Sequence, residues 1–250
     1  MIRAMVFDLD GTLVQTERLK ALSYARAAVE LCPRTLHEED VVEAFGHVVG
    51  LSRQEVATDL VQRFDLRKKA QERMGEFGVG APWQAFVQVR LHHYEQMIAD
   101  PDVLRSNRWP HNVALLEAAR RTGCRTALAT MSRREQARRV LKVLELTEAF
   151  DFVATRDDVE HGKPDPEIYQ LVARELLVPP SECLVIEDSP SGVKSALGAR
   201  MWCIAVTTPF TRDSLHAQHL LDPRWIVDDS ASLVEVVNDM FTLRESDRRV

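Results

Sequence analysis

The sequence predicts an α/β protein in which a doubly wound, Rossmann-like parallel sheet carries an inserted, all-helical domain. Short apolar runs of strand length alternate with helical stretches along most of the chain, and continuous apolar strands are typical of a parallel sheet that is covered on both faces. The alternation stops between Val14 and about Arg105, where the pattern is helical throughout. We therefore expect a core of residues 1–14 and 106–243, a helical domain of residues 15–105 and a frayed tail of residues 244–250.

Six apolar runs account for the strands of this core, and most of them end in Asp, Glu, Thr or Ser. They lie at residues 4–7, 126–129, 152–154, 184–186, 203–206 and 225–227. Helices are predicted over residues 113–121, 135–146, 166–176, 193–199 and 233–241. Strands and helices that alternate in this way are typical of a parallel sheet built from β–α–β crossovers.

The interval after the first strand contains start signals for several helices and no convincing strand. Two patterns indicate capping boxes, Thr35 with Glu38 and Ser52 with Glu55, and Pro82 suits the first turn of a further helix. Ligands of open α/β sheets bind at the carboxyl ends of the strands, so an insertion at this point is expected to act as a lid over the site.

Composition excludes several classes of protein. The chain has 250 residues, of which 45% are hydrophobic and 28% charged, and its formal net charge is −6. These values do not favour disorder or nucleic-acid binding, and a basic stretch at residues 120–142 is better explained as a solvated face. No apolar run approaches the roughly 20 residues that a membrane span needs. Four widely spaced cysteines without a C-x-x-C pattern favour reduced thiols and a cytoplasmic protein. The oligomeric state is left open, and a monomer is compatible with the sequence.

The strongest local signal is the segment 7–13, which reads Phe-Asp-Leu-Asp-Gly-Thr-Leu. Asp8 and Asp10 leave the end of a buried strand, and the period of a strand would point both carboxylates to one side. Two such charges close together need a cation or a proton between them. The alternative is an ordinary turn with two solvated acids.

Three further strand ends carry groups of the same chemical kind. Thr130 and Ser132 follow the second strand of the core, Lys163 precedes a helix, and Glu187 with Asp188 ends the fourth strand. Each has a plain alternative explanation. Ser132 could form a capping box with the glutamate three residues later, Lys163 could be a solvated loop cation, and the two acids could merely begin a helix. Together, the four strand ends indicate a site at one edge of the sheet.

In these four motifs, their order and their spacing, the sequence resembles the haloacid dehalogenase-like superfamily of phosphotransferases. The resemblance covers essentially the whole core. The position of the inserted helical domain is similar to that in the branch containing β-phosphoglucomutase and related sugar-phosphate phosphatases, whose members carry a helical cap there.

The resemblance implies a role for each motif. Asp8 would be the nucleophile and Asp10 the general acid/base. Thr130, the backbone N–H of Met131 and Lys163 would hold the transferred phosphoryl group. Mg²⁺ would be bound by Asp8, the carbonyl of Asp10 and Asp188, together with Glu187.

The chemistry agrees with those residue types. A carboxylate can attack phosphorus and divide a difficult displacement into two steps, a second carboxyl group can supply and take up the proton, and cations offset the repulsion between two anions. The resemblance thus implies a magnesium-dependent phosphatase that acts on a small phosphorylated metabolite, such as a sugar phosphate, through an aspartyl phosphate. A phosphosugar mutase of the β-phosphoglucomutase type is the alternative, and a non-catalytic protein that binds a phosphorylated ligand is the third hypothesis.

The helical domain offers candidates for contacts with the substrate. The segment 50–53, which contains Ser52 and Arg53, resembles the part of the β-phosphoglucomutase cap that holds the distal end of a sugar phosphate; Arg53 is equally explained as the first residue after a helix N-cap. Lys20 stands where that mutase has a histidine, and Val49 stands where it has a lysine. These departures favour hydrolysis over isomerisation.

Overall fold

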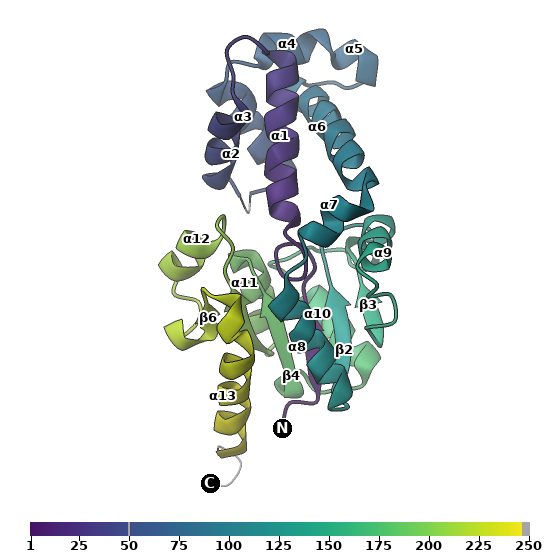
Figure 1. The fold of residues 1–250 in the computed structure, drawn as a ribbon, viewed down its shortest axis with the longest axis vertical. Helices are drawn as coiled ribbons and strands as arrows, with labels where there is room; N and C mark the ends of the chain where they lie inside the picture. The colour runs from purple at the N-terminus through teal and green to yellow at the C-terminus, as the bar shows by residue number, and fades with distance from the viewer. Residues whose placement is uncertain (50, 247–250) are drawn as a thin grey trace. The chain divides into compact units, whose positions relative to one another are not determined.

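The computed structural model describes residues 1–49 and 51–246 (Figure 1). The chain divides into two compact units. The core unit consists of Met1–Gln15 and Leu104–Val250, and the inserted unit is Thr16–Val103.

The core unit is built on a single sheet of six parallel strands. They are β1 (Ala4–Phe7), β2 (Arg125–Ala129), β3 (Phe152–Ala154), β4 (Cys183–Glu187), β5 (Trp202–Val206) and β6 (Ile226–Val227), in the order β3-β2-β1-β4-β5-β6. The chain moves outward from β1 through β2 to β3 and then crosses back to β4 on the other side of β1. The predicted doubly wound parallel sheet is therefore confirmed, and its order reverses between β1 and β4, where such sheets form their sites.

Helices follow each strand and cover both faces of the sheet. In the core unit they are α8 (Pro110–Arg121), α9 (Arg134–Val143), α10 (Glu167–Leu176), α11 (Pro190–Gly198), α12 (Arg212–Ala217) and α13 (Leu233–Ser246), with α7 (Pro101–Ser106) at the boundary between the units. Short 3₁₀ turns lie at Arg156–Asp158, Pro180–Glu182, Pro223–Trp225 and Ser230–Ser232. Helices α10 and α11 pack on one face, while α8 and α13 contact each other on the opposite face (Figure 1).

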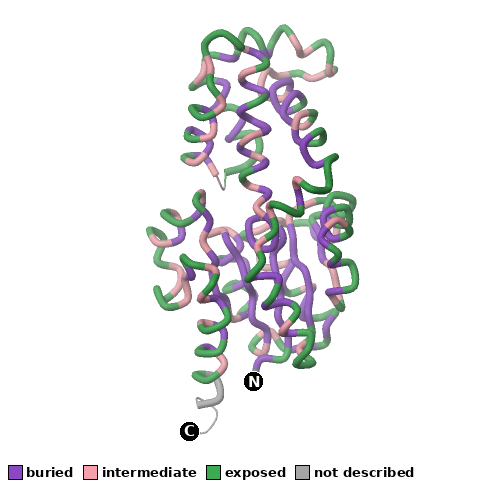
Figure 2. Tube along the Cα trace, viewed as in Figure 1, coloured by how far each residue is buried: buried purple, intermediate pink, exposed green. Residues whose placement is uncertain are grey.

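Burial of alternate side chains on both faces holds the sheet in place. Val6, Ala127 and Val185 join one buried cluster with side chains of α10 and α11, whereas Phe7 and Leu128 are equally buried and, by the alternation of strand residues, point to the other face. Figure 2 shows the strands as the most continuously buried part of this unit. Each large apolar side chain that is fully buried contributes roughly 1.5–3 kcal/mol.

The inserted unit is helical, and no strand occurs among its described residues. Its helices are α1 (Thr16–Leu31), α2 (Glu38–Gly46), α3 (Arg53–Arg63), α4 (Arg67–Glu72), α5 (Met74–Phe77) and α6 (Pro82–Ala99). The rings of Tyr24, Phe45 and Phe86 join α1, α2 and α6, with centroids 5.6 and 5.7 Å from that of Tyr24. This aromatic cluster gives the unit a small core of its own.

The capping box of α3 is confirmed, and the one expected at Thr35 is wrong. The N–H of Glu55 donates to the Ser52 hydroxyl over 3.3 Å, and the N–H of Ser52 donates to the Glu55 carboxylate over 2.9 Å. Helix α2 instead begins after His37, which makes no side-chain cap, so Glu38 is its first residue rather than its third. Three acids in the first turn of α2 complement the helix dipole without a box.

Several predicted helix boundaries also shift. The helix expected over residues 135–146 ends at Val143, because Glu145 adopts a left-handed conformation with φ 60°. The predicted tail begins inside α13, which continues to Ser246, and residues 247–250 lie outside the described part of the chain.

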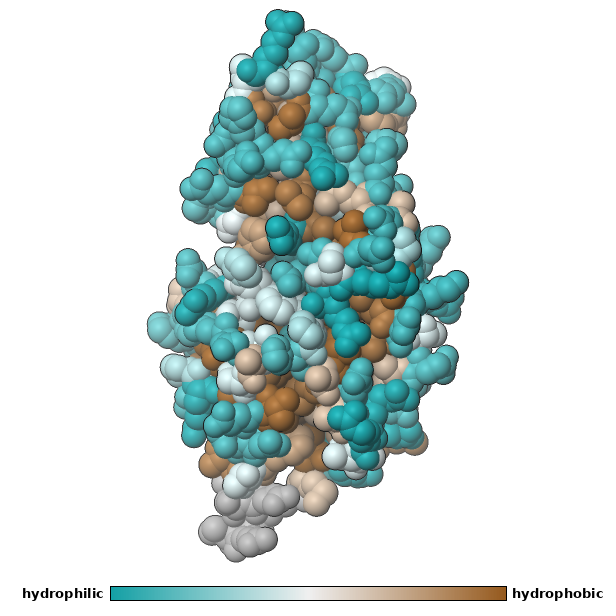
Figure 3. Space-filling view, viewed as in Figure 1, coloured by the Kyte–Doolittle hydropathy of each residue, from teal (hydrophilic) through white to brown (hydrophobic). Residues whose placement is uncertain are grey.

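None of the described helices has the length and hydropathy that a membrane crossing requires. The face drawn in Figure 3 is mostly hydrophilic, with apolar side chains in small scattered groups.

Candidate active site

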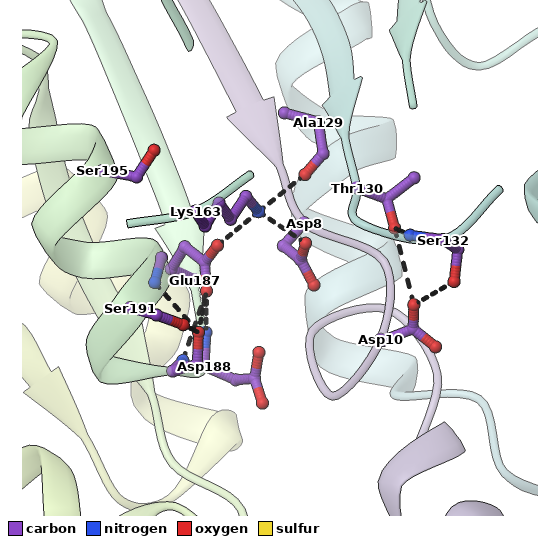
Figure 4. Close-up of polar contacts among 12 residues, drawn as sticks. Asp8, Asp10, Ala129, Thr130, Ser132, Lys163, Glu187, Asp188, Ser191 and Ser195 are labelled. Carbon is purple, nitrogen blue, oxygen red and sulfur yellow. Dashed lines mark hydrogen bonds and ion pairs between the residues drawn. The ribbon is translucent and has the colours of Figure 1, made fainter. Parts of the chain in front are cut away.

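The strand register brings the predicted motifs to one edge of the sheet. Phe7 of β1 pairs with Leu128 of β2 and with Ile186 of β4. Asp8 therefore stands one position beyond the paired strands, and its N–H donates to the carbonyl of Ile186 over 3.0 Å. Glu187 ends β4 at the level of Asp8, and Thr130 follows β2 one residue further on, so side chains from three strand ends meet there (Figure 4).

Lys163 lies at the centre of this group. Its ammonium donates to Asp8 Oδ1 over 2.7 Å, to Glu187 Oε1 over 2.6 Å and to the carbonyl of Ala129 over 2.8 Å (Figure 4). The side chain is only 4% exposed, so the alternative of a solvated loop cation is wrong. Burial alone would lower the pKa of Lys163, but the two carboxylates raise it above its usual value, and the ammonium stays charged.

Asp8 is buried and has a perturbed proton affinity. Burial is the largest effect and raises the pKa of Asp8 to about 7, although the ammonium of Lys163 opposes it; Glu187 and Asp10 raise it further. A cation bound beside Asp8 would lower this pKa again and favour the charged carboxylate.

The acidic cluster has the composition of a site for a divalent cation. Carboxylate oxygens of Asp8, Glu187 and Asp188 all lie within 4.8 Å of one another, and all three residues are buried. One ammonium against three buried carboxylates leaves two negative charges, which a divalent cation would balance. Carboxylate oxygens are the ligands that Mg²⁺ and Ca²⁺ prefer, so the residues present fit the magnesium ion that the resemblance implies.

Glu187 differs from the other two carboxylates because its oxygens already accept several hydrogen bonds. Oε1 accepts from Lys163 and from the Tyr169 hydroxyl at 2.6 and 2.9 Å. Oε2 accepts from the N–H of Asp188 at 3.0 Å and from the N–H and hydroxyl of Ser189 at 3.2 and 3.1 Å. A carboxylate offers about four lone-pair positions, so Glu187 is better suited to hold Lys163 than to hold the ion.

Two glycines let backbone approach these carboxylates. A β-carbon at residue 11, where φ is +88°, would stand 2.0 Å from Oδ2 of Asp188. A β-carbon at residue 192, near the start of α11, would stand 1.9 Å from the carboxyl group of Glu187. Non-bonded heavy atoms do not approach so closely, so both positions need glycine for the acids to occupy their places.

Asp10 lies in a second part of the site. The Ser132 hydroxyl donates to Asp10 Oδ2 over 2.6 Å, and the Thr130 hydroxyl lies 3.5 Å from the same oxygen. Figure 4 shows the Asp10 carboxylate turned toward these hydroxyls and away from Lys163. The suggested capping box of Ser132 is wrong: Arg133 occupies the N-cap of α9, and the serine is bonded to Asp10 instead.

Met131 lies beside the loop that carries Lys163. It is half-buried, and its sulfur is 3.0 Å from the position that a β-carbon on Gly162 would take. The side chain therefore packs where a larger residue at 162 would clash.

Three polar contacts of the site were missed in the sequence. Ser132 is expected only as a strand-end hydroxyl, with a helix cap as the alternative, Ser189 has no expected role, and Tyr169 falls on the apolar face of α10. Ser189 could have been found from its place directly after two strand-end acids. No pattern distinguishes Tyr169 from an ordinary core aromatic.

The expected substrate contacts Lys20, Ser52 and Arg53 all lie in the inserted unit. Burial raises the pKa of Tyr24, and the charges of Arg90, Arg53 and Lys20 lower it in part, so all three cations act on this phenol. Arg90 was not anticipated; it is 5% exposed, and its guanidinium lies 5.0 Å from the ring of Tyr24 and 4.7 Å from that of Tyr94. Ser52 is engaged in the cap of α3.

The fold and the acidic site agree with a match to a family of hydrolases. The family model of haloacid dehalogenase-like hydrolases matches residues 2–200, and the chain belongs to this family. The resemblance inferred from the four motifs is thus confirmed, and the protein is an enzyme of the hydrolase class.

The chain is similar to several individual members of this family. The chain is 28% identical over 198 residues to the phosphorylated carbohydrates phosphatase of Thermotoga maritima, covering 79% of this chain and 82% of that protein. It is 28% identical over 217 residues to validoxylamine A 7′-phosphate phosphatase of Streptomyces hygroscopicus, covering 86% and 90%. Among solved structures, a "putative beta-phosphoglucomutase" from Thermotoga maritima superposes with a TM-score of 0.69 at 25% identity, covering 95% of this chain and 99% of that one.

Proposed function

We propose that this protein is a magnesium-dependent phosphatase that hydrolyses a small, sugar-like phosphomonoester through an aspartyl-phosphate intermediate. The observation that carries the proposal is the contact of Lys163 with Asp8 inside a buried cluster of acids at the carboxyl edge of the sheet. The relatives that are phosphatases of phosphorylated carbohydrates support the substrate class.

In the first step, a carboxylate oxygen of Asp8 forms a bond to phosphorus while the bond from phosphorus to the ester oxygen breaks. Asp10 donates a proton to that leaving oxygen. In the second step, Asp10 takes a proton from water, the water oxygen bonds to phosphorus, and the bond to Asp8 breaks. Inorganic phosphate leaves, and both carboxyl groups return to their initial state.

The remaining residues stabilise charge on the transferred group. Lys163 supplies a fixed positive charge, and Thr130 with the backbone N–H of Met131 supplies hydrogen bonds to phosphoryl oxygens. Asp8, Asp188 and the carbonyl of Asp10 would hold Mg²⁺, which supplies charge neutralisation between the two anions. Glu187 holds Lys163 in place.

The inserted unit is assigned to substrate recognition. Lys20, Arg53 and Arg90 gather positive charge around Tyr24, which suits an anionic or hydroxyl-rich leaving group. This cluster of the inserted unit, rather than the core motifs, would determine which phosphorylated metabolite the enzyme selects.

A phosphosugar mutase is the second candidate, because a solved relative bears the name of a β-phosphoglucomutase. A substrate panel with Mg²⁺ separates the candidates. Released inorganic phosphate supports the hydrolase, and an isomeric product that requires a bisphosphate supports the mutase. The Asp8→Asn chain should show neither activity; turnover near the native rate in that chain would overturn the assignment of the nucleophile.

A further inference from the structure

Tyr169 of α10 is a buried polar residue at the site, outside the four motifs. It is completely buried, and its hydroxyl donates to Glu187 Oε1 over 2.9 Å. Its ring lies 5.0 Å from the ammonium of Lys163. The other buried residues of α10 are Ile168, Val172, Ala173 and Leu176, which are all apolar. A hydroxyl in this row must be hydrogen-bonded to be tolerated, and it is bonded to the carboxylate that holds Lys163.

The ammonium of Lys163 has no N–H to spare. It has three donors, and Asp8, Ala129 and Glu187 accept one each. If Lys163 binds a phosphoryl oxygen, as the proposed function requires, one of these three bonds must be exchanged.

The three acceptors are not equally fixed. The Ala129 carbonyl belongs to the last residue of β2. Glu187 accepts from the turn at residues 188–189 through Oε2 and from Tyr169 through Oε1, and Gly192 closes against it. The Asp8 carboxylate is the acceptor that must itself turn to phosphorus.

We propose that Tyr169 is a positioning residue for Lys163. Its hydroxyl fixes Glu187 Oε1 and its ring supports the ammonium, so that Lys163 remains on Ala129 and Glu187 while the N–H given to Asp8 passes to a phosphoryl oxygen. Lys163 thereby covers the nucleophile until the phosphoryl group arrives and releases it at that moment. This inference rests on the proposed function.

Tyr169→Phe tests the hydroxyl, because it keeps the ring and removes only the bond to Glu187. The probe is inorganic phosphate in the presence of Mg²⁺, titrated calorimetrically into the full chain. A hydrogen bond to a charged group is worth roughly 1.5–3 kcal/mol, part of which reaches Lys163, so we expect phosphate affinity to fall on the order of fivefold to tenfold. Unchanged phosphate affinity in Tyr169→Phe would overturn the inference.

Thr126→Val is the matched control. Thr126 is also buried, and its hydroxyl donates to the Ala149 carbonyl over 2.8 Å, but it lies near the amino end of β2, away from the site. We expect a similar loss of thermal stability and native phosphate affinity. A loss of affinity equal to that of Tyr169→Phe would show that the effect is one of general stability and would contradict the inference.

A double-mutant cycle with Lys163→Gln tests whether Tyr169 affects phosphate binding through Lys163. Tyr169→Phe should weaken phosphate binding in the native background and leave it unchanged when Lys163 is already replaced. An equal loss in both backgrounds would contradict a role through Lys163. If Lys163→Gln does not fold, the comparison of Tyr169→Phe with Thr126→Val decides. A native chain that neither binds phosphate nor releases it from any ester would contradict the proposed function itself, whereas native binding that Tyr169→Phe leaves intact contradicts only the role of Tyr169.

Discussion

Gly192 and Glu187 lie so close that a β-carbon on residue 192 would stand 1.9 Å from the glutamate carboxyl group. The glycine is thus part of the wall that confines Glu187 and, through it, Lys163. We predict that Gly192→Ala displaces this carboxylate and destabilises the fold by about 1–3 kcal/mol, as overpacking of a filled core does, with a large loss of turnover.

Gly198→Ala is the control for that change, because Gly198 belongs to the same helix and is exposed. An added β-carbon there meets Pro166 at an ordinary 3.4 Å. It should leave activity native and stabilise by about 0.4–1 kcal/mol. Urea unfolding and phosphate release measure both effects, and equal behaviour of the two alanine variants would refute the role of Gly192.

Ser132→Ala removes the 2.6 Å hydrogen bond that orients Asp10. Because Asp10 is assigned the proton transfers, we expect kcat to fall on the order of tenfold, a part of the roughly 10²–10⁴-fold that a general acid–base group contributes, with KM nearly unchanged. Thr122→Ala, which removes a hydroxyl bonded to a local carbonyl at the end of α8, should leave kcat native. A drop confined to KM would place Ser132 in substrate binding instead.

Magnesium should stabilise the protein more strongly at alkaline than at acidic pH. The pKa of Asp8 in the metal-free fold, about 7, is above its unfolded value, so the folded state binds the extra proton and metal-free stability falls as the pH rises from about 4 through 7. Mg²⁺ competes with that proton. We expect the rise in Tm on adding Mg²⁺ to be larger at pH 8 than at pH 6 and to lose most of this pH dependence in Asp8→Asn. A rise that is independent of pH in the native chain would contradict this account.

Asp158→Asn should destabilise the core unit. Partial burial raises the pKa of Asp158, but hydrogen bonds from the Thr155 hydroxyl and N–H, with the charge of Arg134, lower it overall. Its contribution is therefore present above the unfolded pKa and is lost as the pH falls through the lower folded value. Removing the charge should cost about 1–2 kcal/mol at pH 7. Urea unfolding of both chains should give stabilities that converge once the pH is below the folded pKa of Asp158, and an undiminished difference there would indicate another cause.

Arg53→Ala tests the assignment of the inserted unit to substrate recognition. We expect KM for the best substrate of the panel to rise by about tenfold, the loss of one charged contact, with kcat less affected. Arg63→Ala is the control at the other end of α3, where the arginine is paired with Asp59 at 3.0 Å. Equal KM values for the two variants would remove Arg53 from the substrate contacts.

Much of the site could be predicted because parallel strands end at a common edge. Asp8, Lys163, Glu187 and Asp188 were found from their places at strand and loop ends, and the structure brings them together. Their division of labour could not be predicted. Glu187 and Asp188 are adjacent in sequence, yet only the turn at residues 188–189 and the tyrosine of α10 show that Glu187 is occupied by donors.

The capping boxes illustrate the same limit. Thr35 and Ser52 begin the same local pattern, but only Ser52 stands at a helix start. Ser132 also fits the pattern, and its hydroxyl bonds to Asp10, 122 positions away. A serine hydroxyl can accept from a nearby N–H or donate to a distant carboxylate, and which it does depends on the groups that the fold brings within reach.

The order of apolar runs, the helical interval and the spacing of acids were enough by themselves to determine a parallel α/β sheet with an insertion and the edge at which its chemistry lies. Those features depend on local periodicity and on the shared direction of the strands, which the chain carries in its own residues. Only the tertiary structure decided the partners of Ser132 and Tyr169, the burial of Arg90 and the two glycine contacts with carboxylates. Each of these depends on how closely segments that are far apart along the chain approach each other in space. Hydrogen bonds and van der Waals contacts form only between atoms at short range, and no local pattern in the sequence specifies which distant segments come that close.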